Sequence, residues 1–159
     1  MADADDLRSY LAQHSFFIGL SDAHLDLLGS YASAARYGAQ QRVFKYDTDA
    51  NQFYVLRDGK VGVEIPAVSG EPLRIQTVGS GGVLGWSWLI PPYRWAFDAR
   101  ALVPSEIVVL DGARLRAQCE TDSKLGYELM KRFAALMAER LNASRLAAIR
   151  QYSGDYHSG

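Results

Sequence analysis

The sequence predicts an α+β fold, in which helices at both ends of the chain enclose an antiparallel sandwich or barrel of roughly eight short strands. Apolar residues recur at helical spacing before residue 31 and again after residue 123. From about residue 36 to residue 111, short aromatic and β-branched runs alternate with turn signals. For 159 residues we expect one domain over 1–152, followed by a flexible tail over 153–159.

Two short helices are predicted near the N-terminus. Leu7, Tyr10 and Leu11 share one face of the first, within DADDLRSYLAQHSFF. Ser21 is the predicted N-cap of the second, whose apolar side carries Leu25 and Leu28.

The predicted strands follow in close succession. RVFKYD, QFYVLRDGKVGVEIP and LRIQTVG are the first runs, and FDARALV and EIVVLD come after the glycine-rich stretch. Asp58-Gly59 is a turn signal that predicts a hairpin between FYVL and VGVEI. PAVSGEP predicts a second turn, between VGVEI and LRIQTV.

After Asp111 the pattern becomes helical again. DGARLRAQCETD predicts a short helix or turn, and one long helix is expected from about 123 to 151, capped by Ser123 or Asp122. Its apolar stripe carries Leu125, Leu129, Phe133, Leu136, Met137 and Leu141. We expect this stripe both to cover the β core and to pair with the same helix of a second chain, which predicts a homodimer. The basic residues of this helix are interpreted as a solvated face; they are Lys124, Lys131, Arg132, Arg140, Arg145 and Arg150.

Composition excludes several classes of protein. The net charge of -1 gives no general attraction to nucleic acid or to an anionic membrane, so neither is expected as a partner. Cys119 is the single cysteine, so no internal disulfide is expected. The acidic start lacks the apolar region of a secretory signal, and no apolar run is long enough to span a membrane. We therefore expect a cytoplasmic protein.

Catalytic and metal-binding motifs are incomplete. GSGGVLG matches neither the dinucleotide fingerprint nor the Walker loop. GWSWL resembles a nucleophile elbow, but Leu89 replaces the glycine that its sharp turn requires. His14, His24 and His157 lie near the termini and offer no base, and no set of residues has the spacing of metal ligands. The chain is therefore not expected to be an enzyme, and no cofactor or metal is predicted.

Two stretches resemble one known family. FFIGLSDAHLDLL is similar to an opening F-x-x-L-x-x-x-x-L helix, and QRVFKYDTDANQFYVLRDGKVGVEI is similar to an apolar strand, a Gly-Asp turn and the pattern FYV-x-x-x-G-x-V. Gly59 matches the glycine of that pattern, and Tyr46 replaces the glycine often found before Asp47. Over about residues 15 to 150 the chain thus resembles the cyclic-nucleotide-binding domain family. The resemblance implies a β jelly-roll, or double-stranded β-helix, that acts as a catabolite-activator-like sensor.

The same resemblance places a phosphate-binding cassette within GGVLGWSWLIPPYRWAFDARA, in a degenerate form. Gly85 matches the cassette glycine, Trp86 takes the place of a glutamate that accepts from the sugar, and Arg94-Trp95-Ala96 aligns with R-[ST]-A. In that family a helix N-terminus and an arginine hold the cyclic phosphate. The predicted ligand-binding residues are Gly85, Trp86, Ser87, Arg94, Trp95, Ala96, Ser144 and Arg145.

The last two residues come from ALMAERLNASRL, which resembles the dimer helix of the bacterial regulators, where Ser144 and Arg145 fall near the base. Those regulators continue into a helix-turn-helix domain. This sequence carries no recognition helix, so DNA binding is not expected.

The register of the cassette leaves two alternatives open. Arg100 lies six residues after Arg94 but five after Trp95, and a slip of one residue in a strand moves a side chain to the opposite face. Either Arg94 points into the pocket and meets an anion, or Trp95 does and the phosphate site is lost. An arginine without an anion would pair with a carboxylate such as Asp98 or Glu106, or extend into solvent.

Two functions therefore remain open. The chain is either a non-catalytic sensor that binds a small anion, with cAMP or cGMP as candidates, and signals to a partner protein, or a filled binding fold that serves as a protein-interaction or structural module.

Overall fold

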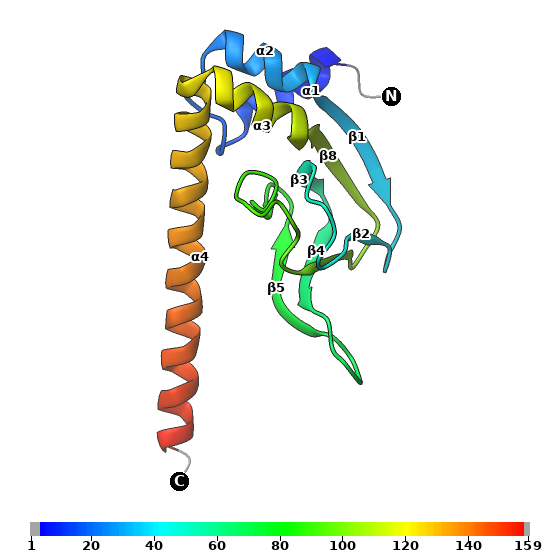
Figure 1. Ribbon diagram of the computed structural model, residues 1–159. Helices are drawn as coiled ribbons and strands as arrows, with labels where there is room; N and C mark the ends of the chain where they lie inside the picture. The colour runs from blue at the N-terminus through cyan, green and yellow to red at the C-terminus, as the bar shows by residue number, and fades with distance from the viewer. Residues whose placement is uncertain (1–3, 158–159) are drawn as a thin grey trace.

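The computed structural model describes residues 4–157, with side chains over 5–152, and it confirms the predicted α+β fold (Figure 1). Two four-stranded antiparallel sheets form the β core. The first has the strand order β1 (Ala32–Tyr37), β8 (Ser105–Asp111), β3 (Gln52–Asp58) and β6 (Val83–Leu84). The second has the order β2 (Arg42–Phe44), β7 (Asp98–Ala101), β4 (Lys60–Ile65) and β5 (Leu73–Gly79). The helices are α1 (Ala4–Gln13), α2 (Asp22–Ser30), α3 (Gly112–Thr121) and α4 (Ser123–His157).

The core lies between the sheets and under the helices. Residues 53–56 of β3 are all buried, because one face of this central strand meets the second sheet and the other meets helices. Phe44 on β2 stacks against Tyr54 across the two sheets. Phe53 packs against Phe133 of α4 and Phe17 of the segment after α1. One continuous apolar core therefore joins both sheets to the helices.

The hairpin predicted at Asp58-Gly59 is wrong. β3 pairs with β8 and β6, whereas β4 pairs with β7 and β5, so the chain crosses from one sheet to the other at this point. Gly59 has a φ of 126°, and a Cβ there would overlap the Ser105 hydroxyl. The turn predicted over 66–72 is confirmed, because it joins the paired strands β4 and β5.

The positions of two strands, β1 and β6, differ from the sequence-based expectation, and the structure decides between the two candidate caps of α4. β1 begins at Ala32, earlier than the change of period near residue 36, and β6 lies in the glycine-rich stretch where no strand was predicted. Ser21 caps α2 as predicted, by accepting a hydrogen bond from the His24 N–H. Asp122 caps α4, because its carboxylate accepts from the Leu125 N–H.

The long C-terminal helix has an inner and an outer part (Figure 1). Leu125, Leu129 and Phe133 are fully buried in the core, so Leu129 and Phe133 of the predicted dimer stripe are occupied within the chain itself. From residue 141 to residue 152 every side chain is exposed, and this part of α4 stands away from the sheets. The helix continues through His157, past the expected end near 151. Mobility of a tail over 153–159 stays a prediction, and residues 158–159 lie outside the described residues.

A second stripe runs along a more exposed side of α4, although its member Met137 is partly buried against the core. Its members follow a spacing of four and three residues and are Met130, Ala134, Met137, Leu141, Ser144 and Ala148. Met130 and Leu141 are 47% and 63% exposed, which is high for large apolar side chains. Over residues 4–157, no helix combines the length and apolar character that a membrane crossing requires.

Candidate functional site

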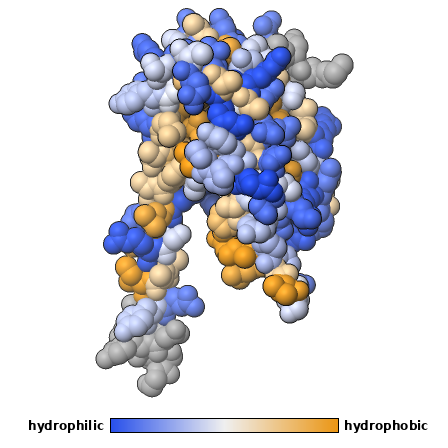
Figure 2. All heavy atoms as spheres, viewed as in Figure 1, coloured by the Kyte–Doolittle hydropathy of each residue, from blue (hydrophilic) through white to orange (hydrophobic). Residues whose placement is uncertain are grey.

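A small cavity at the edge of the β core adjoins a wide groove between the core and α4. The cavity has a volume of about 70 Å³, and four aromatic rings line it: Phe44, Trp86, Trp95 and Phe97. The groove measures about 740 Å³ and separates α4 from β5 and the loop after it. Figure 2 shows the molecule hollowed between α4 and the sheet. Gln76 and Arg140 line both spaces, so the cavity borders the groove at these two side chains.

Trp95 faces the inside of the β core. Its ring is 4% exposed and stacks on Phe44, with 3.9 Å between ring centroids and 11° between planes. Its backbone N–H donates to the Thr48 carbonyl, which fixes the direction of the side chain. Gly85 lies under this ring with a φ of 76°, and a Cβ there would come within 2.9 Å of the indole. Of the two registers left open by the sequence, the structure therefore has the one in which Trp95 points inward.

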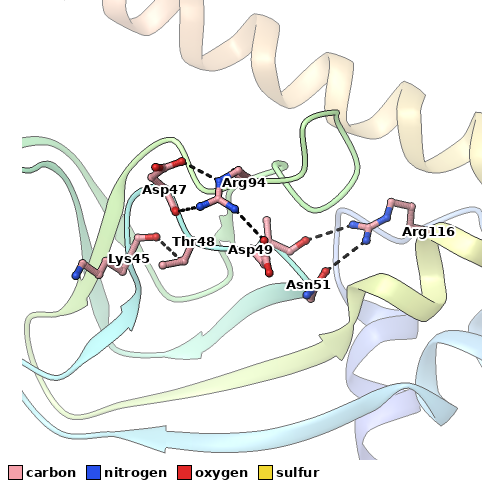
Figure 3. A network of polar contacts seen from close by, with 8 residues as sticks. Lys45, Asp47, Thr48, Asp49, Asn51, Arg94 and Arg116 are labelled. Carbon is pink, nitrogen blue, oxygen red and sulfur yellow. Dashed lines mark hydrogen bonds and ion pairs between the residues drawn. The ribbon is translucent and has the colours of Figure 1, made fainter.

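Arg94 points away from the cavity and toward the β2–β3 turn (Figure 3). Its Nε donates to Asp47 Oδ1 at 2.8 Å, and its Nη1 donates to Asp49 Oδ1 at 3.0 Å. A third N–H bonds the Asp47 carbonyl. The partners are thus Asp47 and Asp49 rather than Asp98 or Glu106. Because the guanidinium is 43% exposed and already paired, it has no geometry for an anion inside the cavity.

A second arginine, missed by sequence reasoning, holds the same segment (Figure 3). Arg116 on α3 donates to the carbonyls of Ala50 and Trp88 and to Asn51 Oδ1. Its guanidinium lies 4.1 Å from the centroid of the Tyr93 ring, in cation–π geometry. Arg94 and Arg116 together tie the segment over residues 88–94 to the β2–β3 turn. Nothing in the spacing around Arg116 indicated this role.

Arg140 is the cation that reaches the cavity. Its Nη2 donates to the Val83 carbonyl, and its guanidinium lies 5.3 Å from the centroid of the Trp86 ring. Burial lowers the pKa of Arg140, with a smaller opposing effect from neighbouring Glu139. Within residues 5–152, no carboxylate forms an ion pair with it. Helical spacing indicates the position of Arg140, because Arg140 lies four residues after Leu136 on the inner face of α4. The interpretation of Arg140 as part of a solvated face is therefore wrong.

The other predicted residues divide into two groups. Gly85, Trp86, Ser87, Trp95 and Ala96 line the cavity. Ser144 and Arg145 lie on the exposed outer part of α4 and line neither the cavity nor the groove.

The cavity by itself, without the adjoining groove, is smaller than a cyclic nucleotide. Pockets for drug-sized ligands measure about 300–1,000 Å³, several times the volume found between these rings. Trp86 occupies the position where an acceptor for sugar hydroxyls was expected, and of the described residues that line the cavity none is acidic. Arg94, which was to hold the phosphate, is engaged by Asp47 and Asp49.

Comparisons with known proteins agree on the fold. A family profile described as cyclic nucleotide-binding domain matches residues 34–122. A protein from Geobacter metallireducens GS-15, described as cyclic nucleotide-binding, is 29% identical with a TM-score of 0.76; the match covers 89% of this chain and 99% of that one. A cyclic nucleotide-binding domain from Methylobacillus flagellatus KT is 18% identical with a TM-score of 0.74, over 93% of this chain and 83% of that one.

The regulatory domain of Toxoplasma gondii PKA, solved with cAMP, is 12% identical with a TM-score of 0.69. That match covers 86% of this chain and 50% of the other. Among curated proteins, none matches this chain. At 18% and 12% identity the last two structures establish the shared fold and no more.

Proposed function

This chain belongs to the cyclic nucleotide-binding domain family, and on that premise we propose that it is a non-catalytic regulatory domain that passes occupancy of its cavity to α4. The contact of Arg140 with Val83 and Trp86 carries this proposal, because it joins α4 directly to the wall of the cavity. The contact spans 57 residues of sequence from Arg140 to Val83. Any ligand that enters beside Trp86 changes what Arg140 touches, and α4 responds as a unit.

The wall of the cavity is the proposed ligand site. It is formed by Gly85, Trp86, Ser87, Trp95 and Ala96. Arg94 acts indirectly in this proposal, by anchoring the segment to Asp47 and Asp49.

The signal leaves the domain through the outer part of α4. The exposed stripe that contains Met130 and Leu141 has the four-and-three spacing with which two helices pair, so the active form is a homodimer. A partner protein then recognises the dimer, and both act in the cytoplasm.

Amide hydrogen exchange tests the coupling. Arg140→Gln removes the guanidinium that bonds Val83, so exchange should rise across residues 83–97, far from the substituted position in sequence. Arg145→Gln is the matched control, because it removes the same group from the exposed part of the same helix. Unchanged exchange over 83–97 in Arg140→Gln would show that α4 and the cavity are independent, and the regulatory proposal would fail.

A second function is favoured by one observation. Trp95 stacks on Phe44 inside the β core, and the cavity that both rings help to line holds only about 70 Å³. A filled fold of this kind serves as a protein-interaction or structural module, and ligands do not regulate it. Titration calorimetry helps to separate the regulatory domain from the module. If cAMP, cGMP and the small anions tested give no heat, and Arg140→Gln leaves hydrogen exchange over residues 83–97 unchanged, only the protein-interaction or structural module remains.

A further inference from the structure

We propose that the ligand of this cavity is a compact aromatic carboxylate, whose ring lies against Trp95 and Phe97 in the place of the Trp86 indole and whose carboxylate pairs with Arg140. The inference rests on the proposed function and names the chemical class that its site would take. It differs from a cyclic nucleotide in having no sugar and in being small enough to enter when one side chain moves.

Arg140 lacks the carboxylate partner that several other arginines of this chain have. Arg94 pairs with Asp47, Arg100 with Glu64 and Arg132 with Glu128, all at ion-pair distance. Arg140 has a backbone carbonyl and a ring instead, and no partner for its other N–H groups is found over residues 5–152. A half-buried guanidinium without a counter-anion is unfavourable, so an anion that reaches it is bound with a gain in free energy. A carboxylate matches the two-pronged edge of a guanidinium.

The cavity has a mostly aromatic and aliphatic lining. Four aromatic rings and the aliphatic chains of Val63 and Ile75 surround it. Gln76, Ser87 and Arg140 are the polar side chains among the described residues that line it. A sugar would leave several hydroxyl groups without acceptors there, whereas a ring needs none and gains from stacking. The lining therefore favours a ligand with one flat apolar part and one anionic group.

The volume of the cavity admits a compact ring only after one side chain has moved. An engineered cavity of about 150 Å³ in another protein holds benzene, so about 70 Å³ is too small for a ring until one side chain moves. Trp95 is fixed by Phe44, but Trp86 is half-buried and follows Gly85, whose φ is 76°. The ligand ring takes the place of the Trp86 indole beside Arg140. The carboxylate then lies at the border between cavity and groove, where Arg140 and Gln76 stand.

Benzoate and benzamide form the test, because they share one shape and differ in charge. The full chain is titrated with each while tryptophan fluorescence is followed, since Trp86 and Trp95 both line the cavity. Benzoate should bind at least about tenfold more tightly than benzamide. In Arg140→Gln this preference should disappear, while Arg145→Gln should keep it. Circular dichroism confirms that each variant is folded.

The outcomes separate this inference from the proposed function. The aromatic carboxylate is overturned by any one of three results. These are equal affinity for benzoate and benzamide, a preference for benzoate that survives Arg140→Gln, and no response to benzoate at about 5 mM, a concentration at which millimolar binding is visible. Binding of cAMP in place of benzoate overturns it as well but supports a ligand-responsive domain. If Arg140→Gln raises hydrogen exchange over residues 83–97 but benzoate does not bind, the aromatic carboxylate fails and the regulatory proposal stands. If Arg140→Gln leaves that exchange unchanged, the proposed function itself fails.

Discussion

Gly59 is the residue at which the chain leaves one sheet for the other. A φ of 126° and a Cβ position that would overlap Ser105 both exclude a side chain. Gly59→Ala should lower the free energy of unfolding by about 2 kcal/mol or more, measured by urea denaturation. Gly81→Ala is the control, because Gly81 has a φ of 88° but nothing within 4 Å of its Cβ position. Its cost should be about 1 kcal/mol, from backbone strain alone. Equal losses at the two sites would contradict the steric argument.

Asp122 links α2 to the start of α4. Its carboxylate accepts from the Leu125 N–H and lies 2.9 Å from His24 Nε2, and these two hydrogen bonds, the first being the larger cause, lower its pKa. A folded-state pKa below the unfolded one contributes stability above the ordinary pKa of aspartate, and this stability is lost as pH falls through the folded-state value. Asp122→Asn keeps an acceptor for the cap but not the charge.

The stability difference between the wild type and Asp122→Asn should therefore be present at neutral pH and shrink below about pH 4. Denaturation midpoints measured across this range provide the check. A difference that stays constant down to about pH 2 would show that the charge of Asp122 makes no contribution.

At the scale of single residues, the sequence could name the pocket wall but not the direction of each side chain. Arg94 and Trp95 are neighbours, and what orients them lies far away in sequence: Asp47 and Asp49 for the arginine, and Phe44 for the indole. The inward direction of Arg140 could be predicted from its position four residues after Leu136, because helical periodicity puts both residues on the inner face of α4.

At the scale of elements, strands with strong local preference were predictable and strands made by pairing were not. LRIQTVG matches β5, and EIVVLD lies within β8. β1 reads ASAARY, whose alanines give little β preference, and it is a strand because all six residues pair with β8. β6 has two residues, too few for any period to be visible. Tertiary contacts therefore supplied what local sequence lacked.

The outer face of α4 gives a prediction about assembly. Leu141 is 63% exposed, is not part of the hydrophobic core and lies in the middle of the exposed stripe. Leu141→Glu should leave the fold intact and convert a dimer into a monomer, since a buried unpaired carboxylate in a helix seam is strongly unfavourable. Asn142→Glu, one residue further along the helix, points away from the stripe and should remain a dimer. Light scattering measures both masses, and a wild-type monomer at micromolar concentration would contradict the pairing.

At the scale of the whole molecule, the order of strands is what the sequence could not supply. The turn at Asp58-Gly59 carries the local signal of a hairpin, yet it joins strands of different sheets. Both sheets and α4 meet at the aromatic core, where Phe44, Tyr54 and Trp95 lie together and Phe53 contacts Phe133. Because α4 contributes to this core at one end and carries the exposed stripe along its length, the cavity and the proposed dimer seam would share one element.

If the proposed ligand site and the proposed dimer seam share α4, we expect ligand binding and dimerisation to affect each other reciprocally. If benzoate on Arg140 changes the affinity between two copies of α4, then dimerisation changes the affinity for benzoate by the same factor. The factor should be about fivefold or more, because Arg140 lies on the same helix as Leu141 and one residue before it. The dimer dissociation constant measured with and without benzoate gives one value of the factor. The benzoate affinities of the wild type and of Leu141→Glu give the other, and Asn142→Glu controls for the added charge. A dimer constant that benzoate leaves unchanged would mean that the cavity and the seam act independently, even if each of them exists.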